Sequence, residues 1–249
     1  MNHTRKIEIE HVTFGYEKGK EILKDITFSA SGNEAIGLIG ANGVGKSTLL
    51  KLLVGLHLDF SGVIRVEDVP LEKHTLDKIR SIIGYVFQDS DHQLFMNTVY
   101  EDVAFAPRNY GLSEEEVSGR VEYALEATGI RHLKERQIYK MSGGEKKLVS
   151  IATILSMMPD IIVMDEPSIA LDPKNRRNLI RLLNSFDHLK IIASHDLDMI
   201  LDTCERTILM ADGRIVADDS TEKILRDKEL LENYNLELPL CLQKTGYFG

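Results

Sequence analysis

The chain has 249 residues, of which 43% are hydrophobic and 28% are charged, so it can bury a sizeable core and does not have the composition of a disordered protein. Lys and Arg number 30 and Asp and Glu number 39, and the formal charge of −9 disfavours a free-standing nucleic-acid binder. Cys204 and Cys241 lie in no CxxC or Cys/His cluster, so we expect neither a disulfide framework nor a zinc site, as in a reducing compartment.

Neither a signal peptide nor a membrane span is expected from the sequence. The N-terminal residues contain no apolar core of the kind that a signal peptide needs. The most apolar uncharged run, over residues 148–159, is too short to cross a bilayer. We therefore expect any role at a membrane to depend on a partner protein.

Short strands and one helix are predicted in the first part of the chain. Residues 7–12 alternate apolar and polar side chains, which is typical of a half-buried strand. An apolar strand over 34–39 runs into a glycine-rich turn, and a helix is predicted over 46–56. Two further short strands are predicted over 63–66 and 82–86.

The pattern is mostly helical from residue 98 to residue 157. Ser113 and Glu116 form a capping box that opens one of these helices. Short apolar strands then return over 161–164, 191–193 and 208–210, with the length that buried parallel strands tend to have.

The last part of the chain begins with a hairpin turn at Asp212-Gly213, which leads into a strand over 214–217. A charged helix is predicted from Thr221, and an apolar tail follows. These elements indicate an α/β core interrupted by a helical subdomain at about 88–158. We expect one domain over 5–235 and a C-terminal tail over 236–249, which packs against the domain or contributes to a dimer contact.

A glycine-rich loop joins the predicted strand 34–39 to the predicted helix 46–56. Its glycines let the backbone wrap a phosphate closely, and the N–H groups at the helix start then face the anion. Lys46 can reach the β- and γ-phosphates, and Ser47 can ligate Mg²⁺. The alternative is a glycine-rich turn before an ordinary helix. The loop matches the pattern Gly-x-x-x-x-Gly-Lys-Ser/Thr with Gly40-Ala41-Asn42-Gly43-Val44-Gly45-Lys46-Ser47-Thr48.

Two carboxylates, Asp165 and Glu166, follow the apolar strand 161–164. The ligand of an α/β sheet binds at the carboxyl ends of its strands. We expect Asp165 to hold Mg²⁺, directly or through water, and Glu166 to polarise the water that attacks the γ-phosphate. Without the glycine loop, these residues would be interpreted as a solvated strand end.

A second helix start contains two glycines, in Ser142-Gly143-Gly144-Glu145. Ser142 and Glu145 form a capping box, so a plain helix start is one interpretation. The glycines also expose the helix N-terminus to an anion. One chain does not need two such cradles for one nucleotide, so the second cradle makes sense if it covers a nucleotide held by another copy.

Taken together, these motifs resemble the ATPase subunit of an ABC transporter. Ser142 to Glu145 resemble the Ser-Gly-Gly-Gln of that family's signature sequence, from which Glu145 and the preceding Met141 depart mildly. The resemblance implies a P-loop NTPase (RecA-like) core with an antiparallel β edge and an inserted α-helical subdomain. It also implies ATP and Mg²⁺ as cofactors.

Four more residues match the family in chain order, although each one alone is a weak indication. Tyr16 stands where the family stacks an aromatic ring on adenine, and Gln88 matches the Q-loop glutamine that senses Mg²⁺ and the attacking water. Asp172 ends a segment, 168–172, that is similar to the D-loop. His195 matches the switch histidine that contacts the γ-phosphate.

A narrower resemblance, over residues 87–107, is to the ATPases of energy-coupling factor importers, which take up vitamins or cobalt and nickel ions. In that family a short helix here grips a membrane scaffold protein. We expect Asp91 to offer charge to basic partner residues, and Leu94 and Phe95 to offer apolar anchors. The alternative is an exposed loop with a stray hydrophobic patch.

The resemblance implies a cycle in which two chains close on ATP and open after hydrolysis. The second ATPase subunit is an identical chain or a paralogue, and the further partners are integral membrane scaffold and substrate-binding subunits, at the cytoplasmic face of the membrane. The other interpretations are a soluble ABC ATPase that acts on ribosomes or nucleic acid, and a nucleotide clamp without catalysis. The single ATPase unit and the negative charge disfavour the former, and the set of Lys46, Asp165, Glu166 and His195 disfavours the latter.

Overall fold

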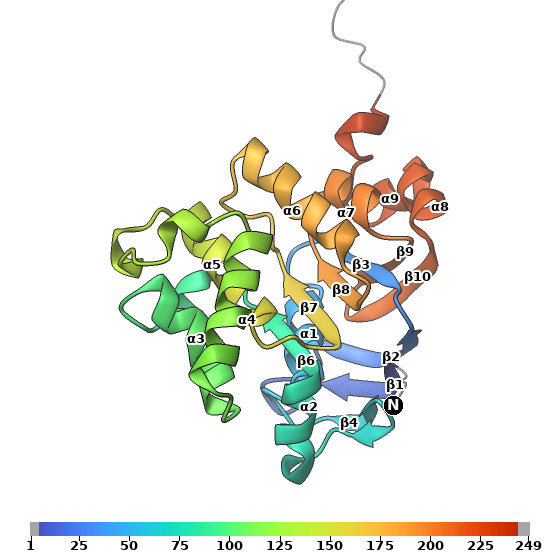
Figure 1. Ribbon diagram of the computed structural model, residues 1–249. Coiled ribbons are helices and arrows are strands. Elements are labelled where there is room, and N and C mark those ends of the chain that lie inside the picture. Colours follow the sequence, from blue (N-terminus) through green and yellow to red (C-terminus); the bar gives the residue numbers. More distant parts are fainter. Residues whose placement is uncertain (1–4, 244–249) are drawn as a thin grey trace, which may run out of the picture. The chain divides into compact units, whose positions relative to one another are not determined.

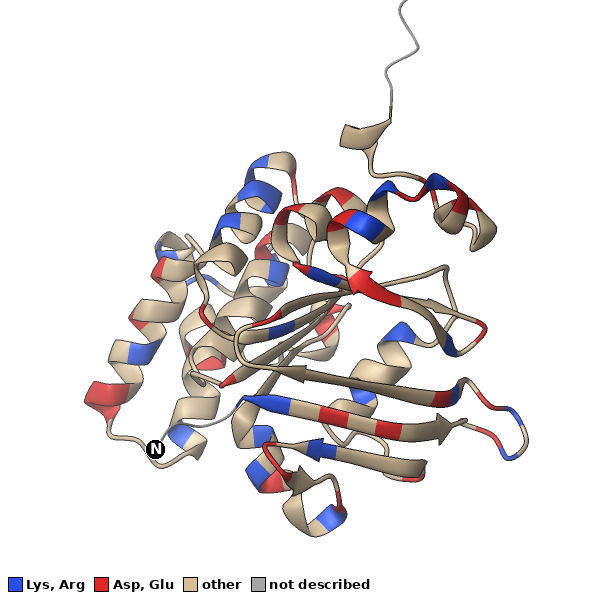
Figure 2. Ribbon diagram, turned by 90° about the vertical axis from the view of Figure 1, so that its right-hand side faces the viewer, with Lys and Arg blue, Asp and Glu red and all other residues tan. Residues whose placement is uncertain are grey.

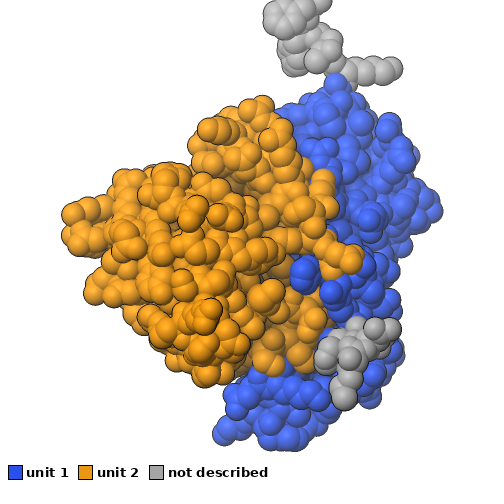
Figure 3. Space-filling model, in the orientation of Figure 1, with its two compact units in different colours: residues 1–79, 188–249 blue, residues 80–187 orange. Residues whose placement is uncertain are grey.

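The computed structural model describes residues 5–243, and the chain divides into two compact units (Figure 3). Unit 1 comprises Met1–Ile79 and His188–Gly249, and unit 2 comprises Arg80–Asp187. Unit 2 contains the whole predicted helical block, 88–158, whose own boundaries stay a prediction. Of the predicted tail, 236–249, the last six residues lie outside the described part of the chain.

One sheet of unit 1 is antiparallel, with the strand order β2-β1-β4-β5 (Figure 1). Its centre is β1, in which Ile7, Ile9 and Val12 are buried. The predicted alternation holds from Ile7 to Glu10. It breaks at His11, which is also exposed and has φ +52° where the β1–β2 register shifts. No element was predicted where β2 lies. The strands are β1 (Lys6–Phe14), β2 (Leu23–Ser31), β4 (Ser61–Val66) and β5 (Val69–Pro70).

The other sheet of unit 1 has a parallel centre. Strand β3 pairs in parallel with β8 on one side and with β9 on the other, and β10 adds an antiparallel edge to β9. Every residue of β3 and β8 is buried, as expected of strands covered on both faces. The strands are β3 (Ala35–Ile39), β8 (Leu189–Ala193), β9 (Arg206–Ala211) and β10 (Arg214–Ser220).

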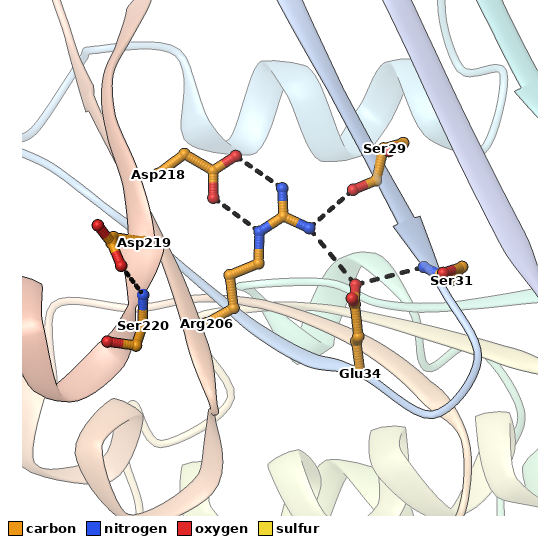
Figure 4. Close-up of polar contacts among 7 residues, drawn as sticks. All are labelled: Ser29, Ser31, Glu34, Arg206, Asp218, Asp219 and Ser220. Atoms are coloured by element: carbon orange, nitrogen blue, oxygen red, sulfur yellow. Dashed lines mark hydrogen bonds and ion pairs between the residues drawn. The ribbon is translucent and has the colours of Figure 1, made fainter.

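The guanidinium of Arg206 on β9 joins the two sheets of unit 1 (Figure 4). Its Nε and Nη2 atoms each donate to the carboxylate of Asp218 on β10 at 2.6 Å. Its Nη1 atom donates to Ser29 O on β2 at 2.8 Å and to Glu34 Oε2 at 3.4 Å. The Asp218 carboxylate raises the pKa of Arg206. The two-point ion pair with Asp218 lies within one sheet and orients the guanidinium, whose bond to Ser29 O links that sheet to β2.

The helices of unit 1 are shorter than the sequence predicts. The helix predicted over 46–56 ends at Leu53, because Gly55 adopts φ +65° and closes the helix. The single charged helix predicted after Thr221 is two helices, because Asp227 interrupts it and caps the second one. The helical elements are α1 (Lys46–Leu53), η1 (Lys73–Thr75), α7 (Leu197–Thr203), α8 (Thr221–Arg226), α9 (Lys228–Asn233) and η5 (Leu240–Leu242).

Unit 2 combines a parallel strand pair with a set of helices. Strands β6 (Ile83–Val86) and β7 (Ile161–Asp165) pair in parallel, and both are buried along their whole length. The capping boxes predicted at Ser113 and at Ser142 are both present. The helices are α3 (Val99–Asn109), α4 (Glu114–Ala127), α5 (Gly143–Leu155) and α6 (Pro173–Ser185), with 3₁₀ turns η2 (Ser90–His92), η3 (Arg131–Leu133) and η4 (Ile138–Lys140); α2 (Leu76–Ile82) carries the chain from unit 1 into unit 2.

Charges of both signs are interspersed on the same helices and strands (Figure 2). Within residues 5–243, every helix is too short or too polar to traverse a lipid bilayer. Cys204 and Cys241 are free thiols, the first buried and the second exposed. Burial raises the pKa of the Cys204 thiol to about 12.

Candidate functional site

In unit 1, the glycine-rich loop connects the buried strand β3 to helix α1, as predicted. Gly40 has φ +146°, and a Cβ there would lie 2.3 Å from Met210 O. Gly45 has φ +107°, and a Cβ there would lie 2.7 Å from a Leu23 methyl group. Both positions therefore exclude other residues. Helix α1 begins without a side-chain cap and without an acidic residue in its first turn, so its N-terminal end suits an anion.

The ammonium group of Lys46 lies over the loop that precedes it. Its Nζ donates to Gly40 O at 2.7 Å and to Ala41 O at 3.0 Å, and it lies 3.3 Å from His195 Nε2. An ammonium can only donate, so a hydrogen bond at this contact needs the His195 tautomer in which Nε2 is the acceptor. The structure thus brings together two predicted site residues that are 149 positions apart.

Tyr16 presents an aromatic ring beside the end of the glycine loop. Its hydroxyl lies 3.2 Å from Thr48 Oγ1, which ties the ring to helix α1. Phe14 and His57 pack edge-on against it, each with ring centroids 5.1 Å away. The side chain remains 51% exposed, so a flat base has room to stack on it.

The other loop residues differ in their exposure. Asn42 and Gly43 are exposed, Ala41, Val44 and Ser47 are half-buried, and Thr48 is buried. The exposed tip of the loop and the first two residues of α1, Lys46 and Ser47, belong to unit 1, so this unit alone carries the whole predicted phosphate cradle.

In unit 2, the two predicted carboxylates stand at the end of β7 and are both buried. Tyr85, on the neighbouring strand β6, donates its hydroxyl to Asp165 Oδ2 at 3.3 Å. Glu166 has φ +48°, a left-handed conformation that costs energy for a residue with a Cβ. Such strain is retained where a side chain must point in one particular direction, which supports a role for Glu166 in the site.

Helix α5 begins at the signature-like motif. Ser142 and Glu145 cap each other: Ser142 N donates to Glu145 Oε2 at 2.8 Å, and Glu145 N donates to Ser142 Oγ at 3.3 Å. Arg136 Nη1 donates to Glu145 Oε1 at 2.8 Å. The Ser142 backbone N–H, the Ser142 hydroxyl and the Arg136 charge hold the pKa of Glu145 below its ordinary value. The Glu145 carboxylate is therefore paired with the Arg136 guanidinium within the chain.

The segment similar to a D-loop packs against this helix start. A Cβ on Gly144 would lie 2.8 Å from Ala170 O, so the second glycine of the motif allows the close approach. Ala170 itself has φ +67°. Asp172 caps helix α6 by accepting from Asn175 N at 2.8 Å and from Asn175 Nδ2 at 2.9 Å. The carboxylate of Asp172 thus caps helix α6.

Gln88 follows β6 and is held to helix α5 by a residue that the sequence analysis did not single out. Lys147 is only 2% exposed, and its Nζ donates to Gln88 O at 2.6 Å and to Phe87 O at 2.9 Å. Burial lowers the pKa of the Lys147 ammonium, while the nearby Asp165, Asp89 and Glu166 carboxylates act in the opposite direction. One indication was available in the sequence, because residue 147 lies on the apolar face of the helix with Ile151.

The segment after Gln88 only partly matches the expected docking surface. Leu94 is 8% exposed and packs inside unit 2, so its prediction as an exposed anchor is wrong. The 3₁₀ turn η2 causes this, because Leu94 N bonds to Ser90 O and turns the side chain inward. Phe95 is 63% exposed and packs edge-on against Phe105 at 4.7 Å. The Asp91 carboxylate already forms a 2.6 Å ion pair with Lys146.

Comparisons with known proteins agree with these motifs. A family described as "ABC transporter" matches residues 23–169. A protein of Geobacter sulfurreducens, whose name assigns it to the ABC transporter ATP-binding proteins, is 48% identical over 98% of each chain. An energy-coupling factor transporter ATP-binding protein of Methanothermobacter thermautotrophicus is 41% identical over 94% of this chain and 76% of its own.

Two solved structures are similar over most of the chain. One is cbiO1 of Clostridium perfringens, described as part of the ABC transporter complex cbiONQ. It is 36% identical, with a TM-score of 0.81 over 95% of this chain and 96% of its own. The other is a dimeric post-hydrolysis ATP-binding cassette bound to ADP and phosphate. It is 26% identical, with a TM-score of 0.80 over 86% of this chain and 98% of its own.

Proposed function

The chain belongs to the ABC transporter family, and on that premise we propose that it is the ATP-hydrolysing subunit of an energy-coupling-factor type importer. The chain is an ABC transporter ATPase that couples ATP hydrolysis to transport. It has the predicted fold, a P-loop NTPase core with an antiparallel β subdomain and a helical subdomain. ATPases of this family bind ATP, dimerise and pair with membrane components.

One observation carries the proposed nucleotide site: the Lys46 ammonium lies at the mouth of the loop, on Gly40 O, Ala41 O and His195 Nε2. Charged phosphate oxygens are stronger acceptors for an ammonium than the carbonyl and imidazole acceptors that it contacts here. In this proposal Lys46 and the loop N–H groups grip the β- and γ-phosphates, and Tyr16 stacks on adenine. His195 contacts the γ-phosphate from the same unit.

The residues proposed to hold Mg²⁺ are Ser47, Gln88 and Asp165. Their hydroxyl, amide and carboxylate groups are all oxygen donors, which Mg²⁺ prefers, and a phosphate-bound Mg²⁺ takes only a few of its ligands from the protein. When bound, the ion would neutralise charge on the β- and γ-phosphates. Residues 5–243 contain no cluster of three or more His, Cys, Asp or Glu side chains that could hold a metal by itself.

We propose that Glu166 accepts the proton of the attacking water, and that the water attacks the γ-phosphorus while the bond to the β-phosphate oxygen breaks. The Ser142, Gly143 and Gly144 tip of α5, with Glu145 beside it and Asp172 in the adjacent segment, would cover the nucleotide of a second ATPase subunit, either an identical chain or a paralogue. Phosphate release then removes contacts from both copies, and the dimer opens.

The importer type is proposed from two observations that reinforce each other. The chain is 41% identical to an energy-coupling factor ATP-binding protein over 94% of its length. In addition, the exposed Phe95 ring, packed on Phe105, gives unit 2 an apolar surface for the helices of a membrane scaffold. We propose cobalt or nickel ions, or a vitamin, as cargo, and the cytoplasmic face of the membrane as the location.

Purification from native membranes in mild detergent tests this proposal. We expect an integral membrane scaffold and a substrate-binding subunit to accompany the chain, whereas ribosomes or DNA in their place would establish the alternative of a soluble ABC ATPase. Phe95→Ser should lose the scaffold while it keeps ATPase activity. Tyr123→Ser, which removes another exposed ring of unit 2, is the matched control and should keep the scaffold.

A further inference from the structure

Lys147 is a buried lysine, and burial of an ammonium group is energetically unfavourable. Its side chain lies inside unit 2 on helix α5, two residues after Glu145 and 2% exposed. Removing an ammonium group from water is unfavourable unless strong hydrogen bonds replace the lost hydration. Lys147 finds them at the backbone carbonyls of Phe87 and Gln88, at 2.9 Å and 2.6 Å. The lysine therefore connects the signature helix to the residue proposed to sense the nucleotide.

The side chain of Gln93 also connects the backbone at Phe87 to helix α5, about one turn after Lys147. Gln93 Oε1 accepts from Phe87 N at 3.1 Å. Gln93 Nε2 donates to Ser150 O at 2.6 Å and to Thr153 Oγ1 at 2.7 Å. The C=O of Phe87 thus accepts from Lys147 of α5, and the N–H of Phe87 is connected to the same helix through the Gln93 side chain.

The backbone of Gln88 is fixed on its other side as well. Asp89 caps the turn η2, with Asp89 Oδ1 accepting from Asp91 N at 2.9 Å. The Gln88 side chain therefore departs from a backbone held by Lys147 at its own carbonyl and by a capped turn directly after it. Such a backbone defines where the Gln88 amide group can reach.

We propose that Lys147 is a positioning residue for the ATPase reaction: it fixes Gln88 to the start of α5, so that Gln88 and the Ser142–Gly144 tip move as one body. The inference rests on the proposed function, in which Gln88 faces the nucleotide of its own chain and the tip faces that of the partner. Loss of the Lys147 ammonium leaves the part-buried carbonyls of Phe87 and Gln88 without this donor. Gln88 would then be free to move while nucleotide binding, which belongs to the glycine loop, stays intact.

A kinetic double-mutant cycle on the full chain separates positioning from stability. The variants are Lys147→Met, which keeps the length of the side chain and removes the charge, Gln88→Ala, and the double variant. Gln88→Ala keeps the carbonyl that Lys147 binds, so a purely structural effect of Lys147→Met persists in that background. Lys134→Met is the matched control, because Lys134 is a partly buried lysine of unit 2 that pairs with Glu122. Steady-state release of radiolabelled phosphate gives kcat and KM, and thermal unfolding is followed by circular dichroism.

We expect Lys147→Met to lower kcat about tenfold while KM for ATP changes less than about twofold. In the Gln88→Ala background the same substitution should change kcat by less than about twofold, because its effect acts through Gln88. Lys134→Met should retain the wild-type kcat.

Two results overturn the inference: an unchanged kcat in Lys147→Met, or an equal loss of kcat with and without the Gln88 side chain. If Lys147→Met does not fold, Lys147→Gln replaces it in the cycle with the same criteria, because it is shorter and uncharged but keeps an N–H donor. A wild-type chain that binds ATP but releases no phosphate contradicts the proposed function itself, and that failure is visible before any Lys147 variant is compared.

Discussion

The two glycine-rich helix starts of the chain, at α1 in unit 1 and at α5 in unit 2, use their N-terminal ends differently. Helix α1 follows Gly45, has no side-chain cap and has no acidic residue in its first turn. Helix α5 is capped by Ser142 and Glu145, and Glu145 also brings a carboxylate. The positive end of the α1 dipole is thus kept for an external anion, whereas that of α5 is already partly satisfied. The difference supports the proposed cycle, in which α1 would grip the nucleotide of its own chain and α5 would cover that of the partner.

The two helix starts should control two different quantities, the affinity for ATP and the closure of the dimer. Substitutions at the α1 start should change the affinity of one chain for ATP, and substitutions at the α5 start should change the closure of two chains around it. Hydrolysis should depend on a third place, the end of β7.

The largest effect on turnover is expected at the end of β7. Glu166→Gln removes the proposed proton acceptor, so turnover should fall at least about 100-fold while both helix starts keep their contacts to ATP. A closed ATP-bound dimer should then accumulate, as measured by phosphate release and by light scattering after size exclusion. Glu115→Gln, on the exposed first turn of α4, is the control and should behave as the wild type. Near-normal turnover in Glu166→Gln would refute the assignment of the base.

The next largest effect is expected at the α1 start. Lys46→Ala removes a charge-assisted contact to the phosphates and should weaken ATP binding by about 10- to 100-fold. Isothermal titration calorimetry of the isolated chain measures this directly. Lys51→Ala, in the last turn of the same helix, should leave the affinity unchanged. Equal affinities of Lys46→Ala and Lys51→Ala would place the nucleotide somewhere other than the glycine loop.

Most features of the two helix starts were predictable from the sequence, because they depend on local patterns. The strand before Gly40, the helix after Gly45 and the capping box at Ser142 each follow from side-chain spacing over fewer than ten residues. No strand was predicted where β2 lies, although its residues alternate between buried and exposed from Ile26 to Ser31 and so carry a period-two pattern. The irregularity is confined to the start of the strand, where Asp25 has φ +57°.

The remaining differences are tertiary and could not be seen locally. Leu94 and Phe95 are neighbouring apolar residues, and only the turn η2 decides that the first is buried and the second exposed. The position of Lys147 on the apolar face of α5 indicates burial but does not identify its hydrogen-bond partners. Its partners are carbonyls 59 and 60 residues away, which no local pattern identifies.

A smaller effect is expected at the α5 start. Glu145→Gln keeps the cap, since Gln also completes a capping box, and removes a negative charge from the tip that would face the γ-phosphate of the partner. Turnover should rise by no more than about twofold, because Arg136 already offsets that charge. The initial rate of phosphate release at subsaturating ATP measures the change. A tenfold rise or any large fall would show that Glu145 does more than cap.

The smallest effect concerns stability at low pH. The pKa of Glu145 lies below its ordinary value of 4.5 in the folded chain, chiefly through the Ser142 N–H, so its contribution to stability is present above that value. The contribution is lost as the pH falls from 4.5 through the lower folded pKa. Denaturant unfolding of wild type and Glu145→Gln between about pH 6 and 3 should therefore show a shallower decline for the variant. Parallel curves would contradict the assigned shift.

Mixing two variants, each with a different defective half of the site, tests most directly whether two copies of the chain share each nucleotide. One carries Lys46→Ala and Glu166→Gln, and the other carries Gly143→Asp and Glu166→Gln. A Cβ at Gly143 meets only Ala170 Cβ, at 3.5 Å, so aspartate fits the tip and repels a phosphate. With ATP, each chain alone should remain monomeric, and the mixture should form a one-to-one dimer with a single sealed site. The account is contradicted if Glu166→Gln alone dimerises but the mixture does not, or if either variant of the mixture dimerises as readily by itself.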